Sequence, residues 1–193
     1  MTNRREFLRT AAALSAAPLA GRAAFAQQHA SALLDAGMFD SRHAAARGFG
    51  ARAGLLGAPL RPIEGDITDL WQRELLPRWR QAPAALAGLT ERPALFLLER
   101  LAWEHGLRVV FEAEHEPLPE GGTAHRVGRS ADPQLARELT TAGAAWPSAL
   151  ADALVAAALV PAGDTRPTEA GLAAHLHEPT KLYSWTIAPR SAA

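Results

Sequence analysis

Residues 84–115 read AALAGLTERPALFLLERLAWEHGLRVVFEAEH, and they decide the fold class. A short apolar run ends at Thr90, and a helix-length segment follows with leucines on one face. Gly106 ends that segment, and the β-branched pair Val109-Val110 begins three residues later. Strand, helix and strand within about thirty residues are typical of a crossover unit with parallel strands. The stretch therefore predicts an α/β fold.

Weaker elements flank this unit on both sides. Pro62 should keep one strand at a sheet edge or in a loop, and Pro77 should break or kink the helix that contains it. The strand that carries Tyr183, Trp185 and Ile187 is expected at a sheet edge. The expected strands cover 30–35, 60–64, 123–127 and 182–187. The expected helices cover 42–52, 132–141, 148–160 and 168–177, and a further helix carries Leu70, Trp71, Leu75 and Trp79.

Strands that alternate with helices predict a small three-layer α/β domain over residues 27–193. We expect a mostly parallel sheet of roughly three to five strands, with antiparallel strands at its edges. An α+β domain is the alternative, in which the weak strands at 31–35 and 60–64 stay outside the sheet. The chain has 193 residues, 48% of them hydrophobic, which is enough for one full core and short for two.

Charge and cysteine content exclude several classes of protein. The 20 basic and 20 acidic residues balance, but residues 1–26 hold four arginines and one glutamate. The remaining chain has 16 basic and 19 acidic side chains and no Lys/Arg cluster, which argues against binding to nucleic acid or anionic lipid. Because the sequence has no cysteine, disulfides, thiolate metal sites, iron–sulfur clusters and a cysteine nucleophile are excluded.

The N-terminus reads as a targeting segment. Residues 3–9, NRREFLR, place an arginine pair before Phe7 and Leu8, and an alanine-rich, moderately apolar run follows. That run is too short to span a bilayer. Residues 24–26, AFA, supply a small-x-small pattern that predicts cleavage after Ala26. A basic amphipathic helix is the alternative for this segment.

Residues 1–26 resemble the twin-arginine signal peptides of bacteria, with Asn3 where Ser or Thr is commoner. The resemblance implies that the export machinery recognises Arg4 and Arg5 and carries the chain already folded, often with a cofactor or a co-exported partner. It also implies a periplasmic or secreted location. No second apolar run reaches transmembrane length, so we expect no stable membrane span.

Polar side chains at the ends of the expected strands form the first candidate site. In an open parallel sheet, ligands bind beyond the carboxyl ends of the strands. Carboxylates, hydroxyls and an imidazole there could act as acid and base or hold a hard cation. Three of the candidates, Asp66, Thr68 and Thr90, are equally well explained as helix caps. The rule selects Asp35, Asp66, Thr90 and His115 as catalytic candidates, with Thr68 and Glu114 beside them.

Two histidines near the C-terminus form the second candidate site. His175 and His177 could chelate an exported metal such as copper if their backbone were extended. On a helix, residues two apart do not face each other, and near a helix end the imidazoles would complement exposed carbonyls instead.

Three glutamates, Glu112, Glu114 and Glu116, would line one face of an extended strand. Three carboxylates could hold a cation, but the prolines that follow favour a solvated strand end.

Three functions fit these features. A non-catalytic binding or accessory protein, folded before export, fits the signal and the lack of a recognised nucleotide, nucleophile or metalloprotease motif. A small cofactor-free hydrolase would use the four catalytic candidates at the strand ends. A periplasmic metal-binding protein would use the histidine pair. The sequence favours the first function, and it identifies no cofactor, substrate or partner.

Overall fold

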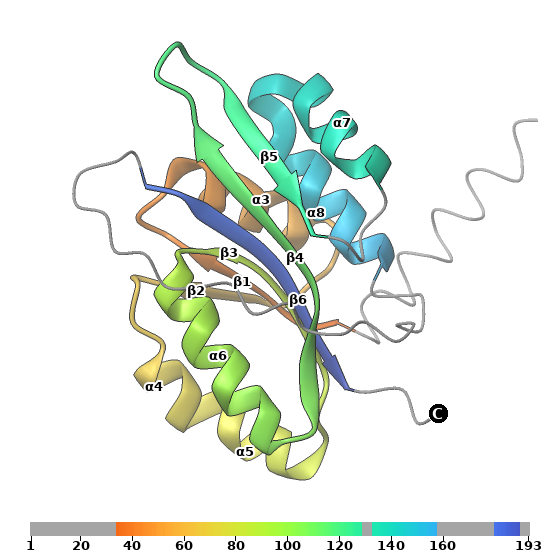
Figure 1. Ribbon diagram of the computed structural model, residues 1–193. Helices are drawn as coiled ribbons and strands as arrows, with labels where there is room; N and C mark the ends of the chain where they lie inside the picture. Colours follow the sequence, from red (N-terminus) through yellow and green to blue (C-terminus); the bar gives the residue numbers. More distant parts are fainter. Residues whose placement is uncertain (1–33, 129–132, 158–179, 190–193) are drawn as a thin grey trace, which may run out of the picture.

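The computed structural model describes residues 34–128, 133–157 and 180–189. Within them, six strands form one sheet in the order β2-β1-β3-β6-β4-β5 (Figure 1). The strands are β1 Leu34–Asp40, β2 Leu60–Ile63, β3 Ala85–Thr90, β4 Leu107–Pro117, β5 Thr123–Val127 and β6 Leu182–Pro189.

The sheet is mixed. β1 pairs in parallel with β2 and with β3, whereas the β3–β6, β6–β4 and β4–β5 pairs are antiparallel. The expected α/β class is therefore confirmed. The expectation of three to five mostly parallel strands is wrong, because the antiparallel half of the sheet is as wide as the parallel half.

The strand–helix–strand unit that the sequence predicts is present as β3, α6 (Arg92–Glu104) and β4. Both strands are antiparallel to β6, so they run in the same direction, although β6 lies between them. Gly106 turns the chain out of α6 with a φ of +75°, a left-handed conformation that favours glycine.

Helices cover both faces of the sheet (Figure 1). We call the two faces the α3 face and the α6 face. Each carries its own cluster of buried side chains, because a strand points successive residues to opposite sides. The α3 face is covered by α3 (Ala44–Leu55), α7 (Pro133–Ala142), the 3₁₀ turn η2 (Gly143–Ala145) and α8 (Trp146–Ala157), and the α6 face by α4 (Thr68–Leu70), the π turn η1 (Trp71–Leu75), α5 (Leu76–Gln81) and α6.

Pro77 distorts its helix, as the sequence predicts. Its missing N–H cannot bond to the preceding turn, and its ring crowds the carbonyl of residue 73. The turn before it, Trp71–Leu75, widens into a π turn, and a new helix, α5, begins with Pro77 in its first turn. Leu75 and Trp79 remain buried on the α6 face.

The expectation of an edge position for the late strand is wrong, because β6 is central. The sequence alternates large apolar residues with Ser184 and Thr186, a pattern that normally marks one solvated face. Here both polar residues are buried, at 0% and 5% exposure, against the α3 face. Small hydroxyl side chains therefore fill the core side of a strand that is covered on both faces.

The first strand ends later than expected. The apolar run at 30–35 predicts its end at Asp35, but β1 spans Leu34–Asp40, so Asp35 lies at its amino end. Pro62 lies in the edge strand β2, as expected. The helix expected at 168–177 lies outside the described residues. Among the helices that are described, none is long and apolar enough to span a membrane.

Candidate functional site

The carboxyl ends of β1 and β3 are neighbours in the sheet, and the chain leaves them toward opposite faces. After β1 it enters α3, on the α3 face, and after β3 it enters α6, on the α6 face. Where successive connections diverge in this way, an open α/β sheet has a crevice in which ligands bind. A ligand is therefore expected at this edge of the sheet.

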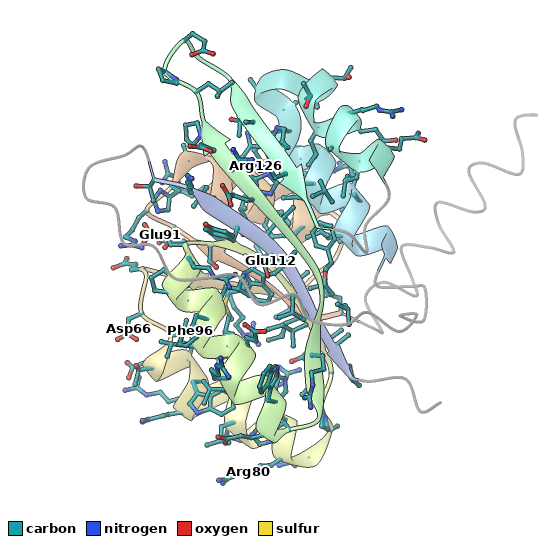
Figure 2. The ribbon with its side chains drawn as sticks, in the orientation of Figure 1. Asp66, Arg80, Glu91, Phe96, Glu112 and Arg126 are labelled. Carbon is teal, nitrogen blue, oxygen red and sulfur yellow. The ribbon has the colours of Figure 1, made fainter. Side chains whose placement is uncertain are left out.

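Three potential metal ligands converge at this point. Asp40 is the last residue of β1, His43 immediately precedes α3, and Glu91 immediately follows β3. Nε2 of His43 lies 2.7 Å from Oε1 of Glu91 and 3.9 Å from Oδ2 of Asp40. One ligand atom from each residue lies within 4.8 Å of the other two. Figure 2 shows Glu91 beside the start of α6.

Arg42 lies between the two carboxylates, and we call Asp40, Arg42, His43 and Glu91 the switch-point cluster. Nε and Nη2 of Arg42 donate hydrogen bonds to Oδ1 and Oδ2 of Asp40 at 2.9 and 2.6 Å. Burial alone would raise the pKa of Asp40, but the hydrogen bonds from Arg42 more than offset it, and the pKa falls below its usual value. Asp40 is therefore a charged carboxylate at neutral pH, although its side chain is fully buried.

The donor set of the switch-point cluster suits a first-row divalent cation. Imidazole nitrogen and carboxylate oxygen bind Zn²⁺ and Mn²⁺, with Zn²⁺ bonds of about 2.1 Å. Ligand atoms around such an ion are roughly 3 to 4 Å apart, so the 2.7 Å separation of His43 and Glu91 must widen and any separation above this range must contract, each by about 1 Å or less. The Asp40 side chain is buried and those of His43 and Glu91 are partly buried, which limits competition from water.

A second polar group lies on the α3 face of the sheet, and we call His115, His125 and Ser184 the histidine network. Nδ1 of His115 lies 2.8 Å from Nδ1 of His125, and its Nε2 lies 2.7 Å from Oγ of Ser184. The indole of Trp146 stacks on the His115 ring with centroids 4.5 Å apart. Burial first, and the neighbouring His125 second, lower the pKa of His115 to about 3.

The spacing of the histidine network is that of a nucleophile, a base and an orienting group. Its surroundings do not suit catalysis. Ser184 and His115 are 0% and 1% exposed, which denies a substrate access. The backbone of Ser184 is paired with β3 on one side and β4 on the other, so its amide cannot serve as an oxyanion donor. The network is a satisfied polar contact within the core.

The structure does not bring the four catalytic candidates together. Asp35 is the second residue of β1 and forms an ion pair with Arg78. Thr90 lies level with Asp40, five residues further along β1, so strand rise separates it from Asp35 by roughly 16 Å. Thr90 accepts a hydrogen bond from Trp185, and His115 bonds to Ser184. Because Trp185 and Ser184 are adjacent on β6, the two candidates lie on opposite faces of the sheet.

The remaining sequence candidates have local partners. Asp66 accepts hydrogen bonds from the backbone N–H and the hydroxyl of Thr68, an Asx turn that lowers its pKa. It is not the helix cap that the sequence suggests, because Ile67 holds the N-cap position of α4. Thr90 caps no helix, since Glu91 holds the N-cap position of α6. The strand that carries the glutamates does not end at His115 but continues to Pro117 and pairs with β5.

The three glutamates of β4 share one face, as the sequence predicts, and basic side chains form ion pairs with all three. Glu112 forms an ion pair with Arg92. Glu114 and Glu116 form ion pairs with Arg126 and Lys181. Figure 2 shows Glu112 and Arg126 on the antiparallel half of the sheet, apart from Glu91.

The sequence did not single out the switch-point cluster. Asp40 lies beyond the end that the sequence predicts for the first strand, and no motif marks it. Its Oδ1 also accepts a 3.2 Å hydrogen bond from the Arg42 amide. The signal that could have found the cluster is the carboxyl-end rule, applied to a strand ending at residue 40 instead of 35. His175 and His177 lie outside the described residues.

An open hollow elsewhere on the surface runs along one side of α7 and is lined by Gln134, Arg137, Glu138, Thr141 and Ala142. It belongs to a single helix and lies apart from the switch-point cluster and the histidine network, so the switch-point cluster is the better candidate. Comparisons of this chain with protein-family models, with curated proteins and with solved structures found no match.

Proposed function

We propose that this chain is a non-catalytic binding protein and that its ligand is a divalent cation held by Asp40, His43 and Glu91. One observation carries the proposal. The ligand atoms of these three residues converge within 4.8 Å at the point where the connections from β1 and β3 diverge. Sites in open α/β sheets are built at such points, whatever their chemistry.

The residue types favour zinc or manganese over calcium or magnesium. An imidazole ligand suits zinc and other transition metals, whereas calcium and magnesium prefer sites made of oxygen alone. Two carboxylates and a neutral imidazole would give the ion a ligand set of charge −2. Asp40 supports this role because its lowered pKa keeps it ionised well below neutral pH.

In this proposal the protein binds its cation in the cytoplasm and is exported folded to the periplasm or the exterior. The support is the sequence of residues 1–26, whose Arg4-Arg5 pair resembles a twin-arginine signal. An accessory role, in which the chain accompanies a co-exported enzyme, retains the export step and adds a protein partner.

The proposal is tested by titrating Zn²⁺ and Mn²⁺ into the full chain after treatment with a chelator. We expect calorimetry to give one equivalent of bound ion, and thermal unfolding to shift upward with ion concentration. At one hundred times the dissociation constant, the stabilisation should be about 2.7 kcal/mol. The proposal would be contradicted if millimolar ion gave no heat of binding and no shift in unfolding temperature.

Variants locate the ion. His43→Ala and Glu91→Gln should each weaken binding at least about tenfold, which corresponds to the loss of about 1.4 kcal/mol. Glu104→Gln is the matched control, since Glu104 is an exposed carboxylate at the far end of α6, and it should bind as the wild type does. A double variant, His175→Ala with His177→Ala, tests the other candidate. If this double variant alone abolished binding, the ion would be held by the C-terminal histidines and the proposal would fail.

A further inference from the structure

The cation ligands of the switch-point cluster are already bound to a side chain of the same chain. Arg42 donates to both oxygens of Asp40, and its Nη2 lies 3.1 Å from Oε1 of Glu91. That oxygen is also the one that faces Nε2 of His43 at 2.7 Å. A metal ion and the Arg42 guanidinium would therefore compete for the same carboxylate oxygens.

The position of the guanidinium is built into the fold. Gly65 lies in the loop after β2 with a φ of +88°, and a Cβ at this position would meet Nη2 and Cζ of Arg42 at 2.6 and 2.7 Å. The carboxyl ends of three neighbouring strands thus surround the guanidinium, since Asp40 ends β1, Gly65 follows β2 and Glu91 follows β3. Its side chain is nonetheless 45% exposed, so solvent is open to it.

We propose that Arg42 is a displaceable internal counter-cation, which occupies the carboxylates of the switch-point cluster until a divalent cation expels it toward solvent. The inference rests on the proposed function and adds a mechanism that controls it. A guanidinium and a metal ion cannot share these oxygens, because the two positive charges would repel each other across a few ångströms. Binding is therefore an exchange of one cation for another.

The exchange sets the affinity of the site. The ion binds only the fraction of molecules in which Arg42 has left, so the measured dissociation constant equals the intrinsic one divided by that fraction. It also makes the ion-free protein stable, since the buried carboxylate of Asp40 keeps a charged partner. A monovalent ion gains too little to expel the guanidinium, so the device favours divalent ions.

Three variants test the exchange by Zn²⁺ calorimetry on the full chain. Arg42→Gln removes the competing charge and should lower the dissociation constant at least about tenfold. Arg42→Lys keeps a competing charge but loses the bidentate contact with Asp40, so its dissociation constant should fall between those of the wild type and Arg42→Gln. Gly65→Ala adds a Cβ that would meet the guanidinium while it preserves every ligand and charge. It also strains the backbone at a φ of +88°, so its fold is checked by circular dichroism, and the folded variant should bind the ion more tightly than the wild type.

The outcomes separate this inference from the proposed function. If the wild type binds Zn²⁺ and Arg42→Gln binds it no more tightly, the inference is overturned and the proposed function still stands. If neither protein bound the ion, the function itself would fail. Because Arg42→Gln leaves Asp40 buried with a weaker partner, circular dichroism should check its fold. If it does not fold, Gly65→Ala decides, and an affinity equal to that of the wild type overturns the inference.

Discussion

Oγ of Ser184 lies 2.7 Å from Nε2 of His115, although the two residues are 69 positions apart in the sequence. Both side chains are buried, and the other ring nitrogen of His115 faces His125. A neutral imidazole has one N–H and one lone pair, so each nitrogen of His115 can be satisfied in either tautomer. The contact holds β6 and β4 together through side chains as well as through the backbone.

Ser184→Ala should destabilise the protein by about 1–3 kcal/mol, because it leaves a buried ring nitrogen of His115 without a partner. Thr186→Val is the matched control. Thr186 lies two residues further on the same face of β6, and its hydroxyl has no partner among the described residues. The control should therefore change the free energy of unfolding by less than about 0.5 kcal/mol. Urea unfolding of the two variants checks this, and equal losses would contradict it.

Stability should fall as the pH is lowered from about 6.5 to about 3. Burial, and then the neighbouring His125, lower the pKa of His115 to about 3, so the unfolded chain takes up a proton that the folded chain refuses. Between these two pH values, the contribution of His115 to the free energy of unfolding should change by up to about 1.4 kcal/mol per pH unit. Above about pH 6.5 its full stabilising contribution is present.

The measurement is urea unfolding at pH 7, 6, 5 and 4. His115→Gln is the control, because it retains polar groups but does not titrate. The wild type should lose more stability than the variant between pH 6 and pH 4, after the common contribution of the carboxylates is subtracted. Parallel profiles of the two proteins would refute the assignment.

Gly88→Ala should destabilise the protein by about 1–3 kcal/mol. A Cβ at residue 88 would lie 2.4 Å from Cζ2 of Trp185 and 2.9 Å from the carbonyl oxygen of Met38, and neither neighbour can move freely within the sheet. Gly48→Ala is the matched control in α3, where the Cβ meets only Pro147 at 3.6 Å. Removing this glycine from a helix interior should raise stability by up to about 1 kcal/mol. Thermal unfolding checks this, and we expect Gly88→Ala to lower the unfolding temperature and Gly48→Ala to raise it.

Export should depend on the arginine pair. Replacing Arg4 and Arg5 together by lysine preserves charge but removes the motif, so the chain should remain in the cytoplasm with residues 1–26 attached. Fractionation and mass spectrometry of the N-terminus measure this, with Arg9→Lys as the control that still yields a product beginning at Gln27. Unimpaired export of the double variant would exclude the twin-arginine route.

The unit of β3, α6 and β4 could be predicted because its sequence signals are local. The apolar face of α6 recurs at helical spacing, Gly106 supplies the turn, and β-branched residues follow at once. The sequence placed β6 wrongly, at a sheet edge. Alternation of large apolar with small polar residues shows that the two faces of a strand differ, but it does not show that the polar face meets water. Ser184 and Thr186 are small and polar, yet both are buried.

The switch-point cluster could not be predicted from residue types alone. His43 and Glu91 are 48 positions apart, and only the parallel register of β1 with β3 brings the loops that carry them together. The sequence places the end of β1 five residues too early, at Asp35 instead of Asp40. That error moves the candidate carboxylate from the carboxyl end of the strand to its amino end. Strand ends are where local signals are weakest, and binding residues are placed there.

The central position of β6 constrains how the protein is made. The ribosome delivers β3 and β4 long before residues 182–189, so each of the two earlier strands keeps an open edge until the last described strand inserts between them. The sheet can close only after residues 182–189 have left the ribosome, and the contacts that close it are distant in sequence. A nascent chain of this kind is vulnerable to edge-to-edge aggregation until β6 has been synthesised.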